Sequence, residues 1–303
     1  MLPAENQAQV QNRSPQRPYN PLVKQQQPVK PATQVVETAK EAVNIPVMEA
    51  SSVFNVQRLQ DRIADITLPS KGILYQDKMP NGIMKIRAMT VKDKKLIAGF
   101  RGDGTSLIEM LISRMSVECK VLPEDMLLQD RVFILLQLRA HSYGDRLAFK
   151  MTCPSCKNEF DKEISISKDF DIKYLPEDTC EPYDLELSNG IKFALKFLRA
   201  KDEKDIINYA GSKKAKTENG DPAYTYRILK HIDSINGIKV SQGNQIEALK
   251  LIESLEVADE KELDKAILAK DFGTDFAIEL QCPACPRQFK GEIPWIEDFF
   301  RNL

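Results

Sequence analysis

The residues best suited to chemistry are two pairs of cysteines in a duplicated motif. Residues 153–164 read CPSCKNEFDKEI and residues 282–293 read CPACPRQFKGEI, so the pattern C-P-x-C-x-x-x-F-x-x-E-I occurs twice. Each copy offers two thiols on a short turn, and four thiolates make up the tetrahedral ligand set of zinc-ribbon sites. We therefore predict that one structural zinc ion is bound by Cys153, Cys156, Cys282 and Cys285.

Two other interpretations of these cysteines remain open at the level of sequence. A single CxxC is also the spacing of thioredoxin-like redox sites, and buried cysteines can stay reduced without a metal. The duplication argues against redox chemistry, which needs one dithiol near a helix N-terminus. Zinc is the favoured interpretation, and four protein ligands would leave no open position for an activated water, which is typical of a structural ion.

The elements that must position the cysteines are strands. Apolar residues alternate with polar ones along residues 147–151 before the first pair and along 276–280 before the second. Each copy is therefore predicted to be a strand, a metal-binding turn and a returning strand. About 125 residues separate the two copies, whereas zinc ribbons typically leave about 15 to 20. The ion would thus join the start of a long insertion to its end.

The rest of the chain divides by composition and periodicity. Residues 1–50 are rich in proline and glutamine and poor in large apolar residues, which predicts a disordered arm. A short docking helix is predicted over residues 51–67, a mainly helical domain over 68–145, and a zinc-ribbon-like α+β domain with an insertion over 146–303.

Local signals predict the elements of these two domains. In the first, a turn at Pro80-Asn81-Gly82 precedes a strand, Thr90 and Asp93 form a capping box, and further helices are expected over 106–117 and 125–141. Between the cysteine pairs we expect a hairpin over 185–198 and helices near 223–233, 245–255 and 259–270. A short aromatic helix is expected over 295–300. The predicted class is α+β: a helical N-terminal part, β-hairpins that close the four-cysteine site, and a helical insertion between the two knuckles.

Composition limits the function. Lysine plus arginine (43) nearly equals aspartate plus glutamate (44), so overall charge does not favour nucleic acid or an anionic membrane. No apolar run reaches the roughly 20 residues of a membrane span, and no signal peptide is recognised, so we expect a cytoplasmic protein with reduced thiols. No nucleophile and base form a recognisable pattern, which predicts no catalytic residues, no cofactor other than zinc, and no enzyme activity. Four residues are interpreted as structural: Cys119, Cys180, His141 and His231.

A resemblance to a known family rests on short motifs between residues 68 and 160. They are Leu68-Pro69-Ser70-Lys71-Gly72, the stretch from Arg87 to Asp93, Asp130-Arg131, Leu138-Arg139, Ser142-Tyr143-Gly144 and the first CPxC. This stretch resembles baseplate hub proteins of contractile-tailed phages of the T-even type. The resemblance covers about a third of the chain and continues in outline to the second cysteine pair, leaving out the arm and the segment between the knuckles.

The resemblance implies a protein that builds the hub of a phage tail baseplate. It would act either as a virion component or as an assembly factor in the host cytoplasm, with other baseplate or tail proteins as partners and the N-terminal arm as a candidate partner-binding segment. The alternative is a zinc-ribbon nucleic-acid-binding or transcription-related module. Because lysines near the knuckles are interleaved with acidic residues, no phosphate-binding stripe is evident, and nucleic acid is the less favoured partner.

Overall fold

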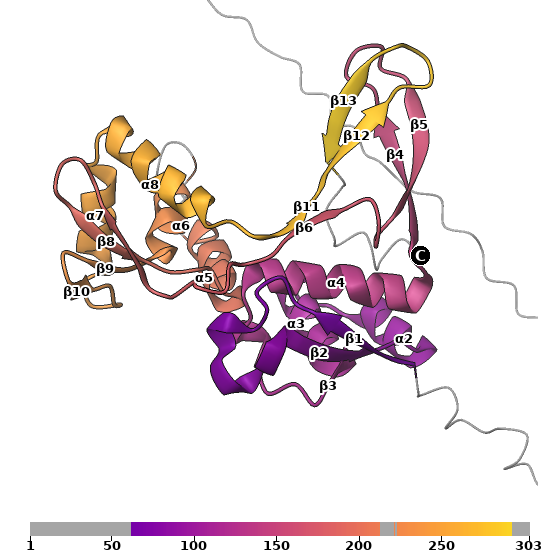
Figure 1. Cartoon of the computed structure of the whole chain (residues 1–303), viewed down its shortest axis with the longest axis horizontal. Coiled ribbons are helices and arrows are strands. Elements are labelled where there is room, and N and C mark those ends of the chain that lie inside the picture. Colours follow the sequence, from indigo (N-terminus) through magenta and orange to yellow (C-terminus); the bar gives the residue numbers. More distant parts are fainter. Residues whose placement is uncertain (1–61, 213–220, 222, 293–303) are drawn as a thin grey trace, which may run out of the picture. The chain divides into compact units, whose positions relative to one another are not determined.

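The computed structural model describes residues 62–212, 221 and 223–292, which are coloured by position in Figure 1. The chain separates into two units, Met1–Ala50 and Ser51–Leu303, and every described residue belongs to the second. The predicted arm, most of the predicted docking helix and the predicted helix over 295–300 lie outside the described residues. Among the described helices, none has both the length and the apolar character that crossing a membrane requires.

The first part of the unit is a three-stranded antiparallel sheet against helices. Its strands are β1 (Ile63–Thr67), β2 (Ile83–Arg87) and β3 (Ser116–Val117), in the order β1-β2-β3. Buried Ile66, Met84 and Ile86 form the face that packs on the core, as the alternation of a half-buried strand requires. The docking helix predicted over 51–67 is therefore wrong for its last five residues, which form a strand with Ile66 buried and Ala64 half-buried on one face.

Tight turns join β1 to β2. Two 3₁₀ segments follow β1, at Ile73–Lys78 and Pro80–Gly82. Gly72 has a φ of 74°, and a Cβ there would lie 2.2 Å from the carbonyl oxygen of Met79. Only glycine fits this position, because both the backbone conformation and the close approach exclude a side chain.

Three helices cover this sheet: α2 (Val91–Gly99), α3 (Gly104–Met115) and α4 (Leu128–Tyr143). The capping box predicted at Thr90 and Asp93 is confirmed. Asp103 caps α3 by accepting a hydrogen bond from the backbone N–H of Ser106. A 3₁₀ turn at Pro123–Asp125 precedes α4, which ends at Gly144 with a φ of 98°. Buried residues lie all around α4, so it is central, as its apolar sequence predicts.

Two β-hairpins carry the cysteines. Strand β4 (Arg146–Thr152) pairs with β5 (Glu159–Ser165), and β12 (Ala277–Gln281) pairs with β13 (Gln288–Glu292). The prediction of a strand, a turn and a returning strand in each copy is confirmed. Figure 1 shows the two hairpins side by side although they lie at opposite ends of the insertion.

The insertion leaves and returns through one short ladder. Strand β6 (Asp171–Lys173) pairs with β11 (Gly273–Asp275). Between them lies a four-stranded antiparallel sheet in the order β10-β9-β8-β7. Its strands are β7 (Tyr183–Glu186), β8 (Lys192–Leu195), β9 (Ile232–Ile235) and β10 (Ile238–Lys239).

The described part of the insertion also contains helices. They are α5 (Ala200–Ala210), α6 (Tyr224–Lys230), α7 (Gln245–Glu253) and α8 (Val257–Ala269). The insertion is therefore α+β, with the expected hairpin at 185–198 as half of its sheet. Helix α5 has no counterpart among the predicted helices, and its buried residues are Ala200, Asp202 and Ile206.

Two hydrophobic cores hold the unit together. One joins the sheet and helices of residues 66–138 to hairpin residues such as Ile164, Ile278 and Leu280. The other is built within the insertion around Phe193, Leu195 and Leu263. The two domains predicted over 68–145 and 146–303 therefore share the first core. The second core belongs to the insertion.

Candidate metal centre

The cysteine pairs lie at the tips of the two hairpins. In the first, the backbone N–H of Cys153 donates to the carbonyl of Asn158 at 2.9 Å. In the second, the N–H of Cys282 donates to the carbonyl of Arg287 at 3.1 Å. Equivalent bonds thus close both turns, because the two motif copies have the same spacing. In each turn the two cysteine sulfurs lie within 4.8 Å of each other.

The four sulfurs form one compact cluster. All lie within 4.8 Å of one another, with Cys153 Sγ 3.8 Å from Cys285 Sγ and Cys156 Sγ 3.6 Å from Cys282 Sγ. A tetrahedral ion bound to sulfur at about 2.3 Å would place its ligands about 3.8 Å apart. The cluster therefore has the dimensions of a four-thiolate metal site and could hold an ion with little rearrangement.

The two hairpins are related by an approximate two-fold axis. Cys153 corresponds to Cys282 in the motif, and Cys156 to Cys285. The short contacts cross between copies, first cysteine to second cysteine in both directions, which is the pattern of an isologous pair. Burial follows the same symmetry: the first cysteine of each copy is buried and the second is more exposed.

Packing beneath the cysteines supports this arrangement. The equivalent residues Phe160 and Phe289 contact each other edge to face, with ring centroids 6.5 Å apart. A Cβ at Gly291 would lie 2.5 Å from Leu280 and 2.6 Å from Met151. The motif position of Gly291 is Lys162 in the other copy, so the pseudo-symmetry is broken at a position where one hairpin packs closely against Met151 of the other.

The surroundings of Cys153 and Cys285 shift the pKa values of these two thiols in opposite directions. Backbone N–H groups of Cys156 and Ser155 point at the sulfur of Cys153 and, against the effect of burial, lower its pKa to about 6. The backbone N–H of Arg287 favours the thiolate of Cys285, but burial and its hydrogen bonds with the other sulfurs outweigh this and raise its pKa to about 12. Hydrogen bonds from the turn therefore favour the thiolate of Cys153, and thiolate is the form that metal binding requires.

The other cysteines and the histidines lie elsewhere. Cys119 Sγ contacts the carbonyl of Val121 at 3.4 Å, and burial raises its pKa. Cys180 is exposed. His141 Nε2 lies 2.7 Å from the carbonyl of Arg62, and burial lowers the pKa of His231. Within residues 62–212 and 223–292, the cysteine cluster is the one group of three or more such side chains positioned to share a metal.

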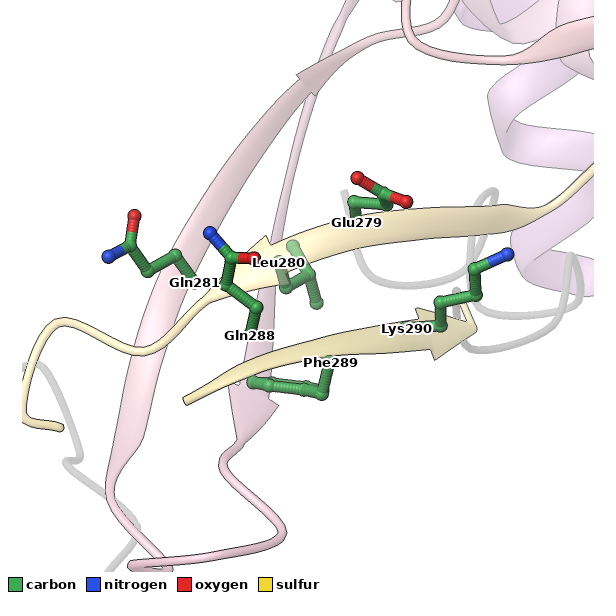
Figure 2. Close-up of a pocket in the computed structure, with 6 residues that line it drawn as sticks. All are labelled: Glu279, Leu280, Gln281, Gln288, Phe289 and Lys290. Carbon is green, nitrogen blue, oxygen red and sulfur yellow. The ribbon is translucent and has the colours of Figure 1, made fainter. Parts of the chain in front are cut away.

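A shallow hollow of about 510 Å³ lies against β12 and β13. Figure 2 shows the residues that line it, all from these two strands. Glu279 and Lys290 are opposite each other in the ladder, as are Gln281 and Gln288. The hollow therefore follows the strands of this hairpin, and none of its lining residues belongs to the cysteine cluster.

The sequence did not reveal a buried ionic cluster around Asp93. Its carboxylate accepts hydrogen bonds from Arg87 at 2.8 Å and Arg114 at 3.2 Å, in addition to those from Thr90. Burial would raise the pKa of Asp93, but the bonds from Arg87 and Thr90 outweigh this and hold it well below its ordinary value. The capping box predicted from the sequence includes Asp93. No local sequence pattern indicated its hydrogen bonds with Arg114 of α3.

A second buried network surrounds Asp130 in α4. The carboxylate accepts hydrogen bonds from the backbone N–H of Ser70 at 2.9 Å and from Tyr75 Oη at 2.8 Å. Tyr75 Oη in turn accepts the N–H of Leu127 at 2.8 Å. Burial raises the pKa of Asp130 to about 6, despite the stabilising bonds from Ser70 and Tyr75. The network connects the turn after β1 to α4, which explains two of the short motifs in physical terms.

Most of the chain matches a known protein family. Residues 71–301, which include both cysteine pairs, match the family described as T4 bacteriophage base plate protein. No curated protein and no solved structure matches the chain. The match extends over most of the sequence and includes the helical part, the insertion and both hairpins. The chain therefore belongs to the T4 bacteriophage base plate protein family.

Proposed function

We propose that the chain is a non-enzymatic structural or assembly protein of a phage baseplate hub, stabilised by one structural zinc ion. Membership of the baseplate family supports a structural or assembly role in a phage tail. The observation that carries the zinc proposal is the convergence of four thiols from two distant hairpins, all within 4.8 Å. The ligands are Cys153, Cys156, Cys282 and Cys285.

Zinc is the metal that best fits this donor set. Four sulfur ligands in a tetrahedron are typical of structural zinc sites, whereas magnesium and calcium require oxygen ligands. Iron–sulfur clusters also use four cysteines, but the sulfur–sulfur distances of 3.6 and 3.8 Å match a single ion. With every ligand supplied by the protein, the ion would join the hairpins and leave no position for a substrate.

Metal analysis of the purified full-length chain tests this proposal. We expect one zinc per chain, retained through gel filtration and lost on treatment with a strong chelator at low pH, where thiolates are protonated. Cobalt substitution should give the absorption bands of tetrahedral cobalt–thiolate coordination. Iron in place of zinc, or no metal in protein purified under reducing conditions, would overturn the proposed site.

The hub assignment rests on the sequence resemblance and is finer than the family match. The motifs at residues 68–72, 87–93, 130–131 and 138–144 carry it. In the structure Asp130 accepts a hydrogen bond from the N–H of Ser70, and the hydroxyl of Ser142 accepts one from the N–H of Met89. A protein of the hub should co-purify with other central baseplate proteins. Mass spectrometry of virions and of assembly intermediates would show whether the chain stays in the finished particle or leaves as an assembly factor. Recovery only with peripheral baseplate proteins would contradict the hub assignment.

The nucleic-acid alternative is not supported by the surface of the hairpins. Lys150 lies opposite Asp161 in the first ladder, and Arg146 forms an ion pair with Glu163. Opposite charges therefore neutralise one another where a phosphate-binding stripe would be needed. A gel-shift experiment with duplex DNA over a range of salt concentrations should show no specific complex.

A further inference from the structure

A positively charged hollow lies at the junction of β2, α2 and α3, apart from the cysteine site. Its volume is about 410 Å³, and its polar lining is Arg62, Arg87, Thr90, Lys92, Asp93 and Arg114. Four cationic residues and one carboxylate thus line the hollow. The whole chain is nearly neutral, with a formal charge of −1, so this concentration of positive charge is local.

The single carboxylate in the hollow is already saturated. Asp93 Oδ2 accepts from Arg87, from the backbone N–H of Thr90 and from the Thr90 hydroxyl, at 2.7 to 2.9 Å. Asp93 Oδ1 accepts from Arg87 and twice from Arg114, all at 3.2 Å. The Asp93 side chain is 2% exposed, whereas Arg87 and Arg114 are 26% and 37% exposed. Asp93 therefore holds two guanidinium groups in place at the surface and offers nothing more to a ligand.

Two cations in the hollow remain available. Arg62 and Lys92 are exposed, and neither side chain has a hydrogen bond or ion pair with another residue in the described part of the chain. Lys92 is in the first turn of α2, where the helix dipole also favours an anion. Two free cations beside two fixed guanidinium groups make the hollow complementary to a negatively charged group.

The dimensions of the hollow indicate which anion fits. A cavity of this size admits one or two side chains, and its lining residues come from a single junction of the fold, whereas a nucleic-acid backbone is bound through phosphate contacts spread along a surface. Arginine guanidinium groups bind carboxylates in a bidentate geometry. We propose that this hollow is a docking site for an acidic peptide segment of a partner protein, with Arg62 and Lys92 as the residues that bind its carboxylates. The site is independent of zinc and of the hub assignment.

Binding of short labelled peptides to the full-length chain tests the proposal. Fluorescence anisotropy would compare a hexaglutamate peptide, a hexaglutamine peptide and a single-stranded oligothymidylate of similar charge. We expect hexaglutamate to bind most tightly and to weaken with added salt, because the contact is electrostatic. Arg62→Ala and Lys92→Ala should each weaken binding by about fivefold, the upper range for an exposed ion pair.

The matched control is Lys95→Ala, which removes the same charge from an exposed position of the same helix but outside the hollow. It should change the affinity by less than about twofold. Thermal denaturation would verify that all three variants stay folded. An equal loss in Lys95→Ala, tighter binding of the oligothymidylate, or no binding of hexaglutamate at low salt would each overturn the proposal.

Discussion

Replacing Cys282 with serine should release the metal and destabilise the protein. The serine hydroxyl remains protonated at neutral pH, so one of four thiolates is lost at a buried position. The sulfur pairs are already 3.6 and 3.8 Å apart, close to the spacing of about 3.8 Å in a zinc–thiolate tetrahedron. Little free energy is then lost in rearranging the hairpins when the ion binds, and high affinity follows.

The size of the effect can be worked from this affinity. An ion present at about a thousand times its Kd stabilises the folded state by about 4 kcal/mol. For a folded unit of about 150 to 250 residues, each kcal/mol changes Tm by about 2 to 4 °C. Loss of the ion should therefore lower Tm by about 8 to 16 °C, and a chelator should give a similar change in wild type but none in the variant.

The assay compares wild type, Cys282→Ser and the control Cys180→Ser, whose exposed thiol lies outside the cluster. Zinc content per chain is measured by elemental analysis and Tm by circular dichroism. The control should keep its zinc and its Tm. A Cys282→Ser variant that still holds one zinc per chain at wild-type Tm would refute the four-thiolate reasoning.

Three further predictions follow from the structure. Because the hairpins are related by a pseudo-two-fold axis, Cys153→Ser and Cys282→Ser should lower zinc affinity and Tm by similar amounts; clearly unequal losses would contradict the symmetry. Gly72→Ala should cost about 2 to 4 kcal/mol in urea denaturation, since its Cβ would lie 2.2 Å from the oxygen of Met79 at a positive φ. The raised pKa of Asp130, about 6 against an ordinary 3.8, should stabilise the fold fully below pH 4, and this contribution of about 3 kcal/mol should disappear as the pH rises through 6. Urea denaturation from pH 4 to 7 should show this decline in wild type and not in Asp130→Asn.

The sequence by itself determined the features that depend on near neighbours. Two copies of the cysteine motif, the alternation that leads into each and the Thr90–Asp93 capping box all predicted local structure that the protein has. These signals are reliable because hairpin turns and helix caps are made by hydrogen bonds between residues a few positions apart. The convergence of the two pairs could be inferred as well, since a four-ligand site explains the duplication.

Only the tertiary structure decided the features that depend on distant partners. The sequence predicted the end of a helix where β1 lies. These five residues form a strand because they pair with β2, which is distant in sequence. The crossed contact of Cys153 with Cys285 and the bond of Arg114 to Asp93 join segments with no common local signal. Such contacts are selected by the packing of whole elements, whose free energy is shared among many residues, so no short stretch of sequence specifies them.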